Sequence, residues 1–460
     1  MKKFLSIFIF IIIFLSGFNV SQSQIQNSRT AHRPNIIWII TDDISLELGC
    51  YGYTQVKTPN LDAFARQGVK HTNTFVTGSV CSISRSALMT GMMQTTIDAH
   101  NHRSHRDDGY ILPAPVKPIT DYLQQAGYYR VLAELTPTGL KKTDHLDFNF
   151  NWPNKYFDGD DWKQRKEGQP FFAEIHIGLT HRGKHWKTSI QQHQPQIDPD
   201  KVKLPPYYPD HPIAREDWAT YLESIQLMDF YVGNFLKRLD KEGLSENTAV
   251  IFISDHGRCH IRDKQFLYDG GIRIPFLMRW PGHLKPGEIN DDLISSIDIS
   301  ATTLKIAGVD VPKYMEGRPF VGPGVKEREY IVAAKDRMDE TVDKMRAVRT
   351  KKYKYIKNYY PDRPYMQPNK YKETEYPVWN HMKELYGQGK LTTEQALFCA
   401  PTKPPEELYD IQADPDELHN LASSSMHQKT IKKFRRILEK WIKETDDKGQ
   451  YPEKELPQTK

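Results

Sequence analysis

Residues 35–43 form a run of apolar residues that stops abruptly at two adjacent carboxylates. They read Asn-Ile-Ile-Trp-Ile-Ile-Thr-Asp-Asp. A continuous apolar run of this length is typical of a strand that is covered on both faces. We therefore expect a central strand of an α/β sheet that ends at Asp42 and Asp43.

Similar segments recur along the chain. Strands are expected at residues 170–179, 249–253 and 272–280, and residues 216–239 carry apolar side chains at helical spacing. Strands that alternate with helices predict an α/β fold, with a large, mixed but mostly parallel sheet flanked by helices.

Polar residues follow these strands directly. In open α/β sheets, sites form just beyond the carboxyl ends of the strands. Asp42 and Asp43 follow the first strand, His181 follows the second, and Asp255 and His256 follow the third. We expect these five residues to meet at one edge of the sheet, although more than 200 positions separate the first from the last.

The sequence changes character after about residue 325. Residues 345–360 alternate apolar and basic side chains, which predicts an antiparallel hairpin, and an amphipathic helix is expected through residues 431–442. We therefore expect a catalytic domain over residues 24–325 and a smaller α+β subdomain over residues 326–460, with an antiparallel sheet and a terminal helix.

The first residues have the pattern of a secretory signal peptide. Lys2 and Lys3 precede an apolar run over residues 4–18, and small and polar residues follow it. The run is shorter than the roughly 20 residues of a membrane span. We expect removal of residues 1–23 and a periplasmic or secreted mature protein without a stable membrane anchor.

The composition is that of a globular protein. Hydrophobic residues make up 38% and charged residues 26% of the chain, so a sizeable core is available and disorder is not expected. The four cysteines are too few for a disulfide scaffold. The net charge of +5 falls to +3 without Lys2 and Lys3, which is compatible with a polyanionic substrate and equally with a solvated surface. We expect no nucleic-acid partner.

Residues 81–91 read Cys-Ser-Ile-Ser-Arg-Ser-Ala-Leu-Met-Thr-Gly. This run resembles the signature of the formylglycine-dependent type I sulfatases of the alkaline-phosphatase-like superfamily, closest in motif style to the iduronate and heparan type and to bacterial polysaccharide sulfatases. The resemblance implies the alkaline-phosphatase-like fold and oxidation of Cys81 to 3-oxoalanine by a formylglycine-generating or anaerobic maturation enzyme. The family usually has Pro or Ala at the position of Ile83, and this departure bears on the efficiency of Cys81 conversion.

Three carboxylates expected at one point would repel one another without a cation, and calcium accepts several oxygen ligands. For the isolated Asp42–Asp43 pair, a turn that caps a helix is the alternative interpretation. The resemblance implies a calcium site formed by Asp42, Asp43, Asp255, His256 and the modified Cys81.

The residues after Cys81 are expected to be helical, and the start of a helix favours an anion. Arg85, one turn into this helix, can hold the modified residue and the carboxylates in place. The resemblance implies that the aldehyde hydrates to a geminal diol, and that calcium lowers the pKa of one hydroxyl, which attacks the sulfur. The alcohol leaves, and the second hydroxyl then expels sulfate and restores the aldehyde.

Charge on the transferred sulfuryl group requires fixed cations. By resemblance, Lys264 is the family lysine before the Tyr-Asp-Gly-Gly turn and His181 is the family histidine after the Phe-Phe strand; either can protonate the leaving oxygen. A family lysine and histidine that follow Ala-Gly-Tyr have no clear match in this chain. We assign Lys142 to the sulfate and leave Asp144 or His145 open as its neighbour.

Residues 100–106 read His-Asn-His-Arg-Ser-His-Arg, the densest His/Arg stretch of the chain. Cysteine or acidic ligands at suitable spacing, which would complete a transition-metal site, are missing. We expect His102, Arg103 and His105, together with His145, to contact acidic sugar or sulfate groups. A solvated polar loop is the alternative.

Together these observations predict a secreted sulfatase that hydrolyses sulfate esters of a sulfated polysaccharide or oligosaccharide. Two alternatives remain open. One is a phosphoester or phosphonate hydrolase of the same superfamily, and the other is a non-catalytic relative that binds sulfated glycans and in which Cys81 is not converted.

Overall fold

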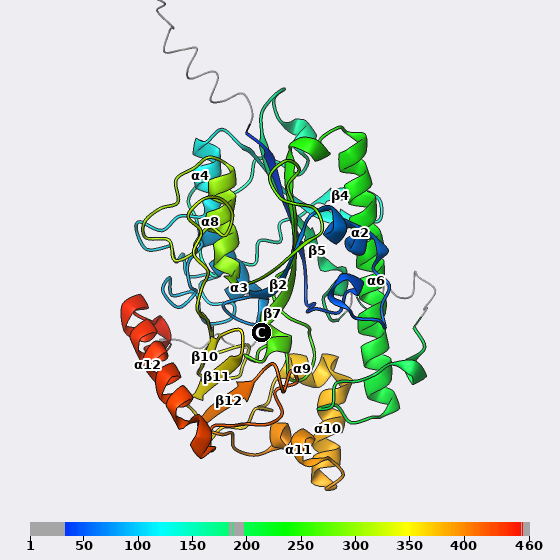
Figure 1. Ribbon diagram of the computed structural model, residues 1–460, viewed down its shortest axis with the longest axis vertical. Helices are drawn as coiled ribbons and strands as arrows, with labels where there is room; N and C mark the ends of the chain where they lie inside the picture. The colour runs from blue at the N-terminus through cyan, green and yellow to red at the C-terminus, as the bar shows by residue number, and fades with distance from the viewer. Residues whose placement is uncertain (1–32, 184–185, 187–196, 452, 454–460) are drawn as a thin grey trace, which may run out of the picture. The chain divides into compact units, whose positions relative to one another are not determined.

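The computed structural model describes residues 33–183, 186, 197–451 and 453, and two β-sheets organise them (Figure 1). The expected signal peptide at residues 1–23 lies outside the described residues. The larger sheet contains, in spatial order, β4 (Gly139–Lys142), β3 (Tyr129–Thr136), β5 (Phe171–Ile177), β1 (Asn35–Thr41), β6 (Thr248–Ser254), β7 (Arg273–Arg279), β2 (Val69–Phe75) and β8 (Glu288–Ser295).

The centre of this sheet is parallel. β3, β5, β1 and β6 run in one direction, and every residue of β1, β5 and β6 is buried. The expected α/β fold with a mostly parallel sheet is confirmed. The strand expected at residues 272–280 is β7, which pairs antiparallel with both β6 and β2. The link from β6 to β7, residues 255–272, contains only the four-residue α7 (Asp269–Ile272) and lacks the longer crossover helix that usually joins parallel neighbours.

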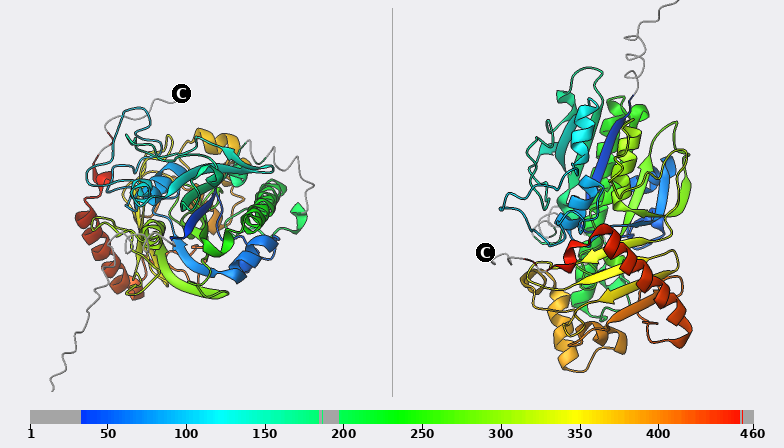
Figure 2. Two further views of the ribbon diagram at one scale, coloured as in Figure 1. Left: turned by 90° about the horizontal axis from the view of Figure 1, so that it is seen from above. Right: turned by 90° about the vertical axis from the view of Figure 1, so that its left-hand side faces the viewer.

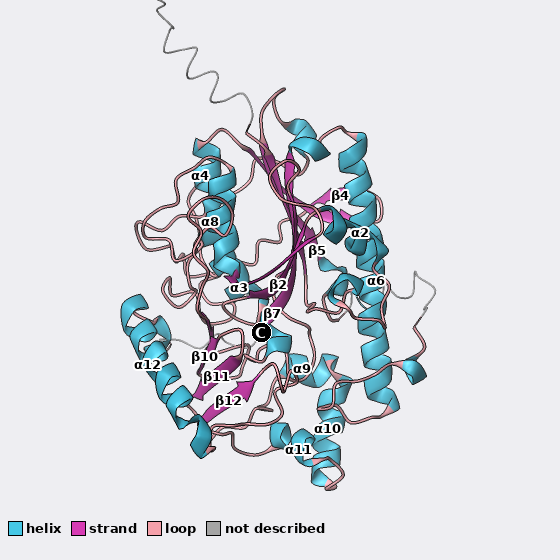
Figure 3. Cartoon of the chain, viewed as in Figure 1, coloured by secondary structure: helices cyan, strands magenta, loops and turns pink. Residues whose placement is uncertain are grey.

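Helices cover both faces of the large sheet (Figures 1 and 3). α3 (Cys81–Thr90), α4 (Ile119–Gln125) and α8 (Ser296–Ile306) pack together on one face, and α2 (Pro59–Gln67) and α6 (Pro212–Lys241) on the other. α6 begins four residues before the expected helix at 216–239, because His211 caps its start and Pro212 occupies its first position.

The smaller sheet is antiparallel, in the order β12 (Glu406–Asp410), β11 (Tyr353–Asn358), β10 (Met345–Arg349) and β9 (Ile331–Lys335). β10 and β11 are the hairpin expected at 345–360. α12 (Gln428–Thr445) crosses this sheet (Figure 2) and buries Ile431, Phe434 and Leu438 against Val348, Tyr355 and Leu408. α9 (Lys370–Glu375), α10 (Pro377–Gly387) and α11 (Thr393–Cys399) precede β12. The proposed domain boundary near residue 325 falls between α8 and β9.

The cysteines and the lengths of the helices are the last features of the fold. All four cysteines are free, so the fold is held together without a disulfide. None of the helices in the described part of the chain combines the length and the apolar character needed to cross a membrane.

Candidate active site and metal centre

Three neighbouring strands bring the acidic residues to one edge of the large sheet. Thr41, the last residue of β1, lies opposite Ile177 of β5 and Ser254 of β6. The strands therefore end at the same level. The amide of Asp255 donates to the carbonyl of Thr41 at 3.0 Å, and the amide of Asp42 donates to the carbonyl of Ile177 at 3.3 Å.

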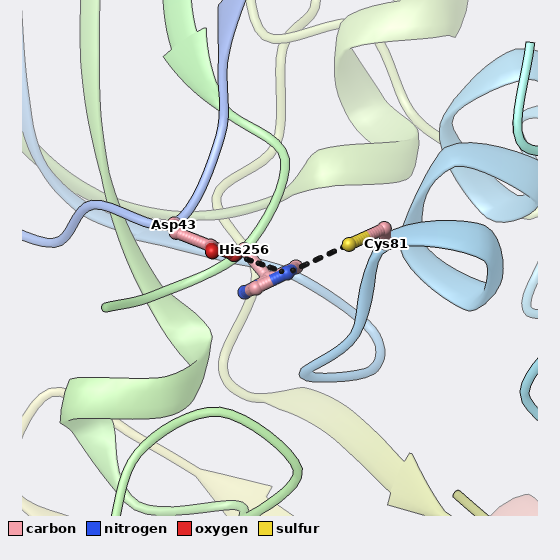
Figure 4. Close-up of side chains that lie close together, drawn as sticks. All are labelled: Asp43, Cys81 and His256. Carbon is pink, nitrogen blue, oxygen red and sulfur yellow. Dashed lines mark hydrogen bonds and ion pairs between the residues drawn. The ribbon is translucent and has the colours of Figure 1, made fainter. Parts of the chain in front are cut away.

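Asp43 belongs to a buried charged cluster, and Figure 4 draws its side chain with those of His256 and Cys81. Its Oδ1 lies 2.8 Å from Nζ of Lys264 and 3.0 Å from Nε2 of His256, and all three side chains are almost completely buried. Burial alone would raise the pKa of Asp43, but Lys264, His181 and His256 hold it well below its usual range. The carboxylate is therefore ionised and surrounded by positive groups.

Cys81 faces the same cluster from the first turn of α3. Its Sγ lies 3.3 Å from Nε2 of His256, and Oγ of Ser84 donates to the carbonyl of Asp255 at 2.5 Å, which ties the helix start to the end of β6. Burial alone would raise the pKa of the Cys81 thiol, but Lys264 and His256 bring it below its ordinary value. This environment favours a negative charge at residue 81.

Arg85 connects the carboxylates one turn further along α3. Its Nη2 lies 2.7 Å from Oδ1 of Asp42, and its Nε lies 3.3 Å from Oδ2 of Asp255. Nη1 lies 3.6 Å from Glu174. Because the guanidinium is planar and presents its donors in a fixed fork, Arg85 sets the relative positions of Asp42 and Asp255.

His181 lies beside Cys81 and Asp43, directly after the short helix η3 (Gly178–Thr180) at the end of β5. Burial alone would lower the pKa of His181, but the Asp43 carboxylate and the contact with Cys81 raise it to about 9. The imidazole is therefore protonated at neutral pH and can donate a proton.

The donor atoms of the cluster suit a divalent cation. One ligand atom each from Asp43, Cys81 and His256 lies within 4.8 Å of the other two. Nδ1 of His256 lies 2.8 Å from the carbonyl of Gly257, so this nitrogen carries a proton, and Nε2 faces Asp43. Burial alone would lower the pKa of His256, but Asp255, Cys81 and Asp43 raise it well above its ordinary value, so Nε2 carries a second proton that a bound cation would replace. A histidine held through its other nitrogen by a backbone carbonyl is typical of metal sites, and carboxylate oxygens suit calcium.

The structure adds two residues that the sequence analysis did not single out. Nε2 of His176 lies 3.0 and 3.1 Å from the two carboxylate oxygens of Asp42, and Glu174 contacts Arg85. His176 and Glu174 are two positions apart in β5 and therefore share one face of the strand. Polar side chains at alternate positions of an otherwise apolar strand are the signal that could have identified them.

Lys142 and His145 have different surroundings in the structure. Lys142 is exposed at the end of β4 and lines a cavity of about 510 Å³ with Asp144 and Lys155, and no described contact joins it to Cys81. The ring of His145, in contrast, stacks on His176 with the ring centroids 4.7 Å apart. Of these candidates, the structure therefore brings His145 next to the residues around Asp42.

The His/Arg stretch is only partly directed at the site. Nδ1 of His102 lies 2.8 Å from Oδ1 of Asp339, a residue of the expected C-terminal subdomain that the sequence analysis missed. The amide of Arg103 donates to Oγ of Ser82, next to Cys81, while its side chain is exposed. His105 is held by residues near it in the chain. Of the three, Arg103 is thus the exposed cation attached to the start of α3.

Ile83 occupies a packed position beside the helix start. It is completely buried and contacts Val80 and Met338. A Cβ atom added to Gly78 would lie only 2.7 Å from Cγ2 of Ile83. The backbone at Gly78 therefore packs directly against the Ile83 side chain.

Two family models match the chain. The sulfatase family model matches residues 34–309, and the model of the C-terminal part of N-sulphoglucosamine sulphohydrolase matches residues 257–397. The first match spans more than half of the chain and contains every residue of the buried cluster.

Individual proteins are also similar. An ulvan-active sulfatase from Formosa agariphila is 33% identical over 470 residues, covering 92% of this chain and 77% of that protein. Human N-sulphoglucosamine sulphohydrolase is 25% identical, covering 90% of each chain. A structure solved with its substrate D-glucosamine-2-N,6-O-disulfate has a TM-score of 0.65 at 16% identity, covering 90% of this chain and 99% of that chain. A phosphonate monoester hydrolase from Silicibacter pomeroyi has a TM-score of 0.63 at 17% identity, covering 90% and 96%. At these identities the two structures show a shared fold alone.

Proposed function

The chain belongs to the sulfatase family and is a sulfuric ester hydrolase, and from this premise we propose that it removes sulfate groups from a sulfated carbohydrate by means of calcium and 3-oxoalanine formed from Cys81. The observation that carries the proposal is the buried group of Asp43, Cys81 and His256. Its ligand atoms converge where the central strands end, and residue 81 lies at the start of a helix.

Asp42, Asp43, Asp255 and His256 would hold the calcium ion. When bound, calcium supplies Lewis-acid stabilisation of the negative charge that develops at the nucleophile and the sulfate. Arg85 keeps Asp42 and Asp255 in place through its contacts at 2.7 and 3.3 Å.

Oxidation of Cys81 would supply an aldehyde whose hydrated form attacks sulfur. The positive end of α3 and the nearby Lys264 favour the anionic form of that nucleophile. The Lys264 ammonium, which supports Asp43, is also the proposed partner for oxygens of the transferred group. Arg103, exposed beside the start of α3, is suited to bind a sulfate or carboxylate of the sugar, and His145 and His102 are further candidates for contacts with it.

His181 serves as the proton donor to the leaving oxygen. Its pKa of about 9 keeps the imidazole protonated at neutral pH. As the bond between sulfur and the ester oxygen breaks, that oxygen takes the His181 proton and leaves as an alcohol. The net reaction consumes one water and releases inorganic sulfate.

The carbohydrate substrate is supported by the relatives. One relative acts on ulvan, and the human relative is an N-sulphoglucosamine sulphohydrolase. We propose a sulfated polysaccharide or oligosaccharide as substrate, with ulvan and glycosaminoglycans as the first panel. Export through the leader at residues 1–23 would bring the enzyme to such polymers, and a formylglycine-generating or anaerobic maturation enzyme would convert Cys81.

Two measurements test the proposal. Mass spectrometry of the peptide containing Cys81, from protein made in its native host, is expected to show the aldehyde; an unmodified thiol would support the non-catalytic alternative. Turnover of matched aryl sulfate and aryl phosphate is expected to favour the sulfate and to disappear in Cys81→Ala but not in Cys50→Ala, a control outside the cluster. Faster phosphate turnover would favour the phosphoester hydrolase, whose fold a phosphonate monoester hydrolase shares.

A further inference from the structure

A second cavity lies at the opposite edge of the large sheet from Cys81. It has a volume of about 810 Å³ and is lined by Arg66 and Gln67 at the end of α2, Asp240 at the end of α6, Glu246, Arg279 at the end of β7, and Lys285. Arg279 pairs with Val250 at the start of β6, whereas the carboxylates of the catalytic cluster follow the end of β6. At about 3.3 Å per residue, the two sites are on the order of 15–20 Å apart along the strand.

Arg279 is buried here without enough partners. It is only 7% exposed, its Nη1 donates to Oε1 of Gln67 at 2.8 Å, and its guanidinium lies 5.4 Å from the ring of Phe64. Within the described part of the chain, Nε and Nη2 have no hydrogen-bond acceptor. Asp240 and Glu246 act on Arg279 through their charge alone. A buried guanidinium with two unpaired nitrogens lacks an acceptor, and an oxyanion would provide one.

The surroundings of Arg279 suit a sugar that carries an anionic group. Arg66 and Lys285 are exposed on the rim and add two positive charges to that of Arg279, against the two carboxylates of Asp240 and Glu246. The carboxylates can accept hydrogen bonds from hydroxyl groups, and the amide of Gln67 can both donate hydrogen bonds to them and accept hydrogen bonds from them. The volume exceeds what an inorganic anion needs and falls in the range of small-molecule sites. Next to the cavity, the rings of Trp280 and His283 stack at 3.8 Å and brace the turn that forms one wall.

We propose that this cavity is a non-catalytic binding site for a sulfated or carboxylated sugar unit of a polysaccharide chain. The nature of the polymer rests on the proposed function, but the site itself does not. A long chain that occupies both the catalytic site and this cavity gains apparent affinity, because the second contact is made within the same complex. A small aryl sulfate reaches only the catalytic site and gains nothing.

Affinity electrophoresis of the full-length Cys81→Ala protein tests the proposal, with dextran sulfate, carboxymethyl dextran and neutral dextran in the gel. Arg279→Gln removes the buried charge, and Arg66→Ala combined with Lys285→Ala removes the rim charges without touching a buried side chain. Lys237→Ala, an exposed lysine of α6 outside the cavity, is the matched control. Both cavity variants are expected to bind an anionic dextran at least about tenfold more weakly, as expected for the loss of a hydrogen bond to a charged group, and the control is expected to bind unchanged.

The choice of polymer in the gel identifies the anionic group that the cavity binds. Retardation of the protein by dextran sulfate indicates a sulfate group, and retardation by carboxymethyl dextran indicates a carboxylate. Equal retardation of the Arg279→Gln protein, the rim variant and the parent would overturn the proposal, as would equal retardation by neutral dextran. In the active enzyme, Arg279→Gln is expected to raise KM for a sulfated polysaccharide and to leave kcat/KM for an aryl sulfate within twofold. If the enzyme with Cys81 intact does not turn over an aryl sulfate, the proposed function is contradicted. The electrophoresis of the Cys81→Ala proteins still tests whether this cavity binds an anionic sugar.

Discussion

Replacement of Arg85 by Met tests whether the buried carboxylates depend on a fixed cation. The guanidinium is 2% exposed and lies 2.7 Å from Asp42 and 3.3 Å from Asp255, whose side chains are 5% and 0% exposed. At an effective dielectric constant of about 20, these distances correspond to about 6 and 5 kcal/mol of gross attraction. Most of this offsets the cost of burying the charges. Removal of one partner of a buried ion pair costs about 3–5 kcal/mol, because the other charge stays buried and unpaired.

The measurement is the free energy of unfolding from urea titrations followed by tryptophan fluorescence, in EDTA and then in calcium. In EDTA, Arg85→Met is expected to lose about 3–5 kcal/mol. Calcium is expected to restore part of the loss, since it binds only the folded site and compensates the same carboxylates. Arg435→Met is the matched control, because its pair with Glu406 is on the surface, with Arg435 43% exposed. It is expected to cost less than about 1 kcal/mol.

A loss below about 1 kcal/mol for Arg85→Met in EDTA would refute this reasoning. It would mean that Asp42 and Asp255 are neutral or solvated in the folded protein. The electrostatic case for a cation among them would then fail, whatever the turnover of the variant.

Four further outcomes are expected. Burial against Phe276 lowers the pKa of His71 to about 4, so its contribution to stability is complete above the unfolded pKa of about 6.5 and is lost, by about 3 kcal/mol, as the pH falls towards 4. His71→Phe should flatten the dependence of the urea midpoint on pH over this window, and an unchanged slope would contradict the assignment. Calcium should raise the melting temperature of the parent and of Asp210→Asn but not of Asp43→Asn, and a rise in Asp43→Asn would count against the metal site. Lys264→Ala should lower kcat for an aryl sulfate by about 10²–10³-fold, with Lys163→Ala as the unaffected control; a loss below tenfold would remove Lys264 from the mechanism. Ile83→Ala should cost about 2–4 kcal/mol of stability and raise the converted fraction of Cys81 measured by mass spectrometry. An unchanged fraction would show that Ile83 does not limit the conversion of Cys81.

The edge of the sheet where Asp42 and Asp255 meet could be predicted because its signals are local. β1 and β6 are continuous apolar runs, and each is followed at once by carboxylates. Parallel strands in one sheet align their carboxyl ends, so two such segments suffice to place residues more than 200 positions apart at one edge. Cys81 was found because its neighbours resemble a family signature.

Other parts depend on contacts between distant segments that leave no local trace. The contact of His176 with Asp42 depends on the register of β5 against β1, and the contact of His102 with Asp339 depends on how the segment after β9 packs against the start of α3. The antiparallel direction of β7 likewise depends on its pairing with β6 and β2. Lys142 lies at the end of β4, which pairs antiparallel with β3, and lines a cavity with Asp144 and Lys155, so its assignment to the sulfate stays a prediction.

The distribution of charge around Asp255 gives the strongest physical reason for a divalent cation. Burial would raise the pKa values of Asp42 and Asp43, but His176 and Arg85 hold that of Asp42, and Lys264 and His181 that of Asp43, below the usual range. For Asp255, burial raises the pKa above its ordinary value and the charges of Asp42 and Asp43 add to this, because His256 and Arg85 compensate them only in part. Arg85 is shared among three carboxylates, and Lys264 is engaged by Asp43. The proposed divalent cation among Asp42, Asp43 and Asp255 would supply the missing charge and would complement the two fixed cations, Arg85 and Lys264.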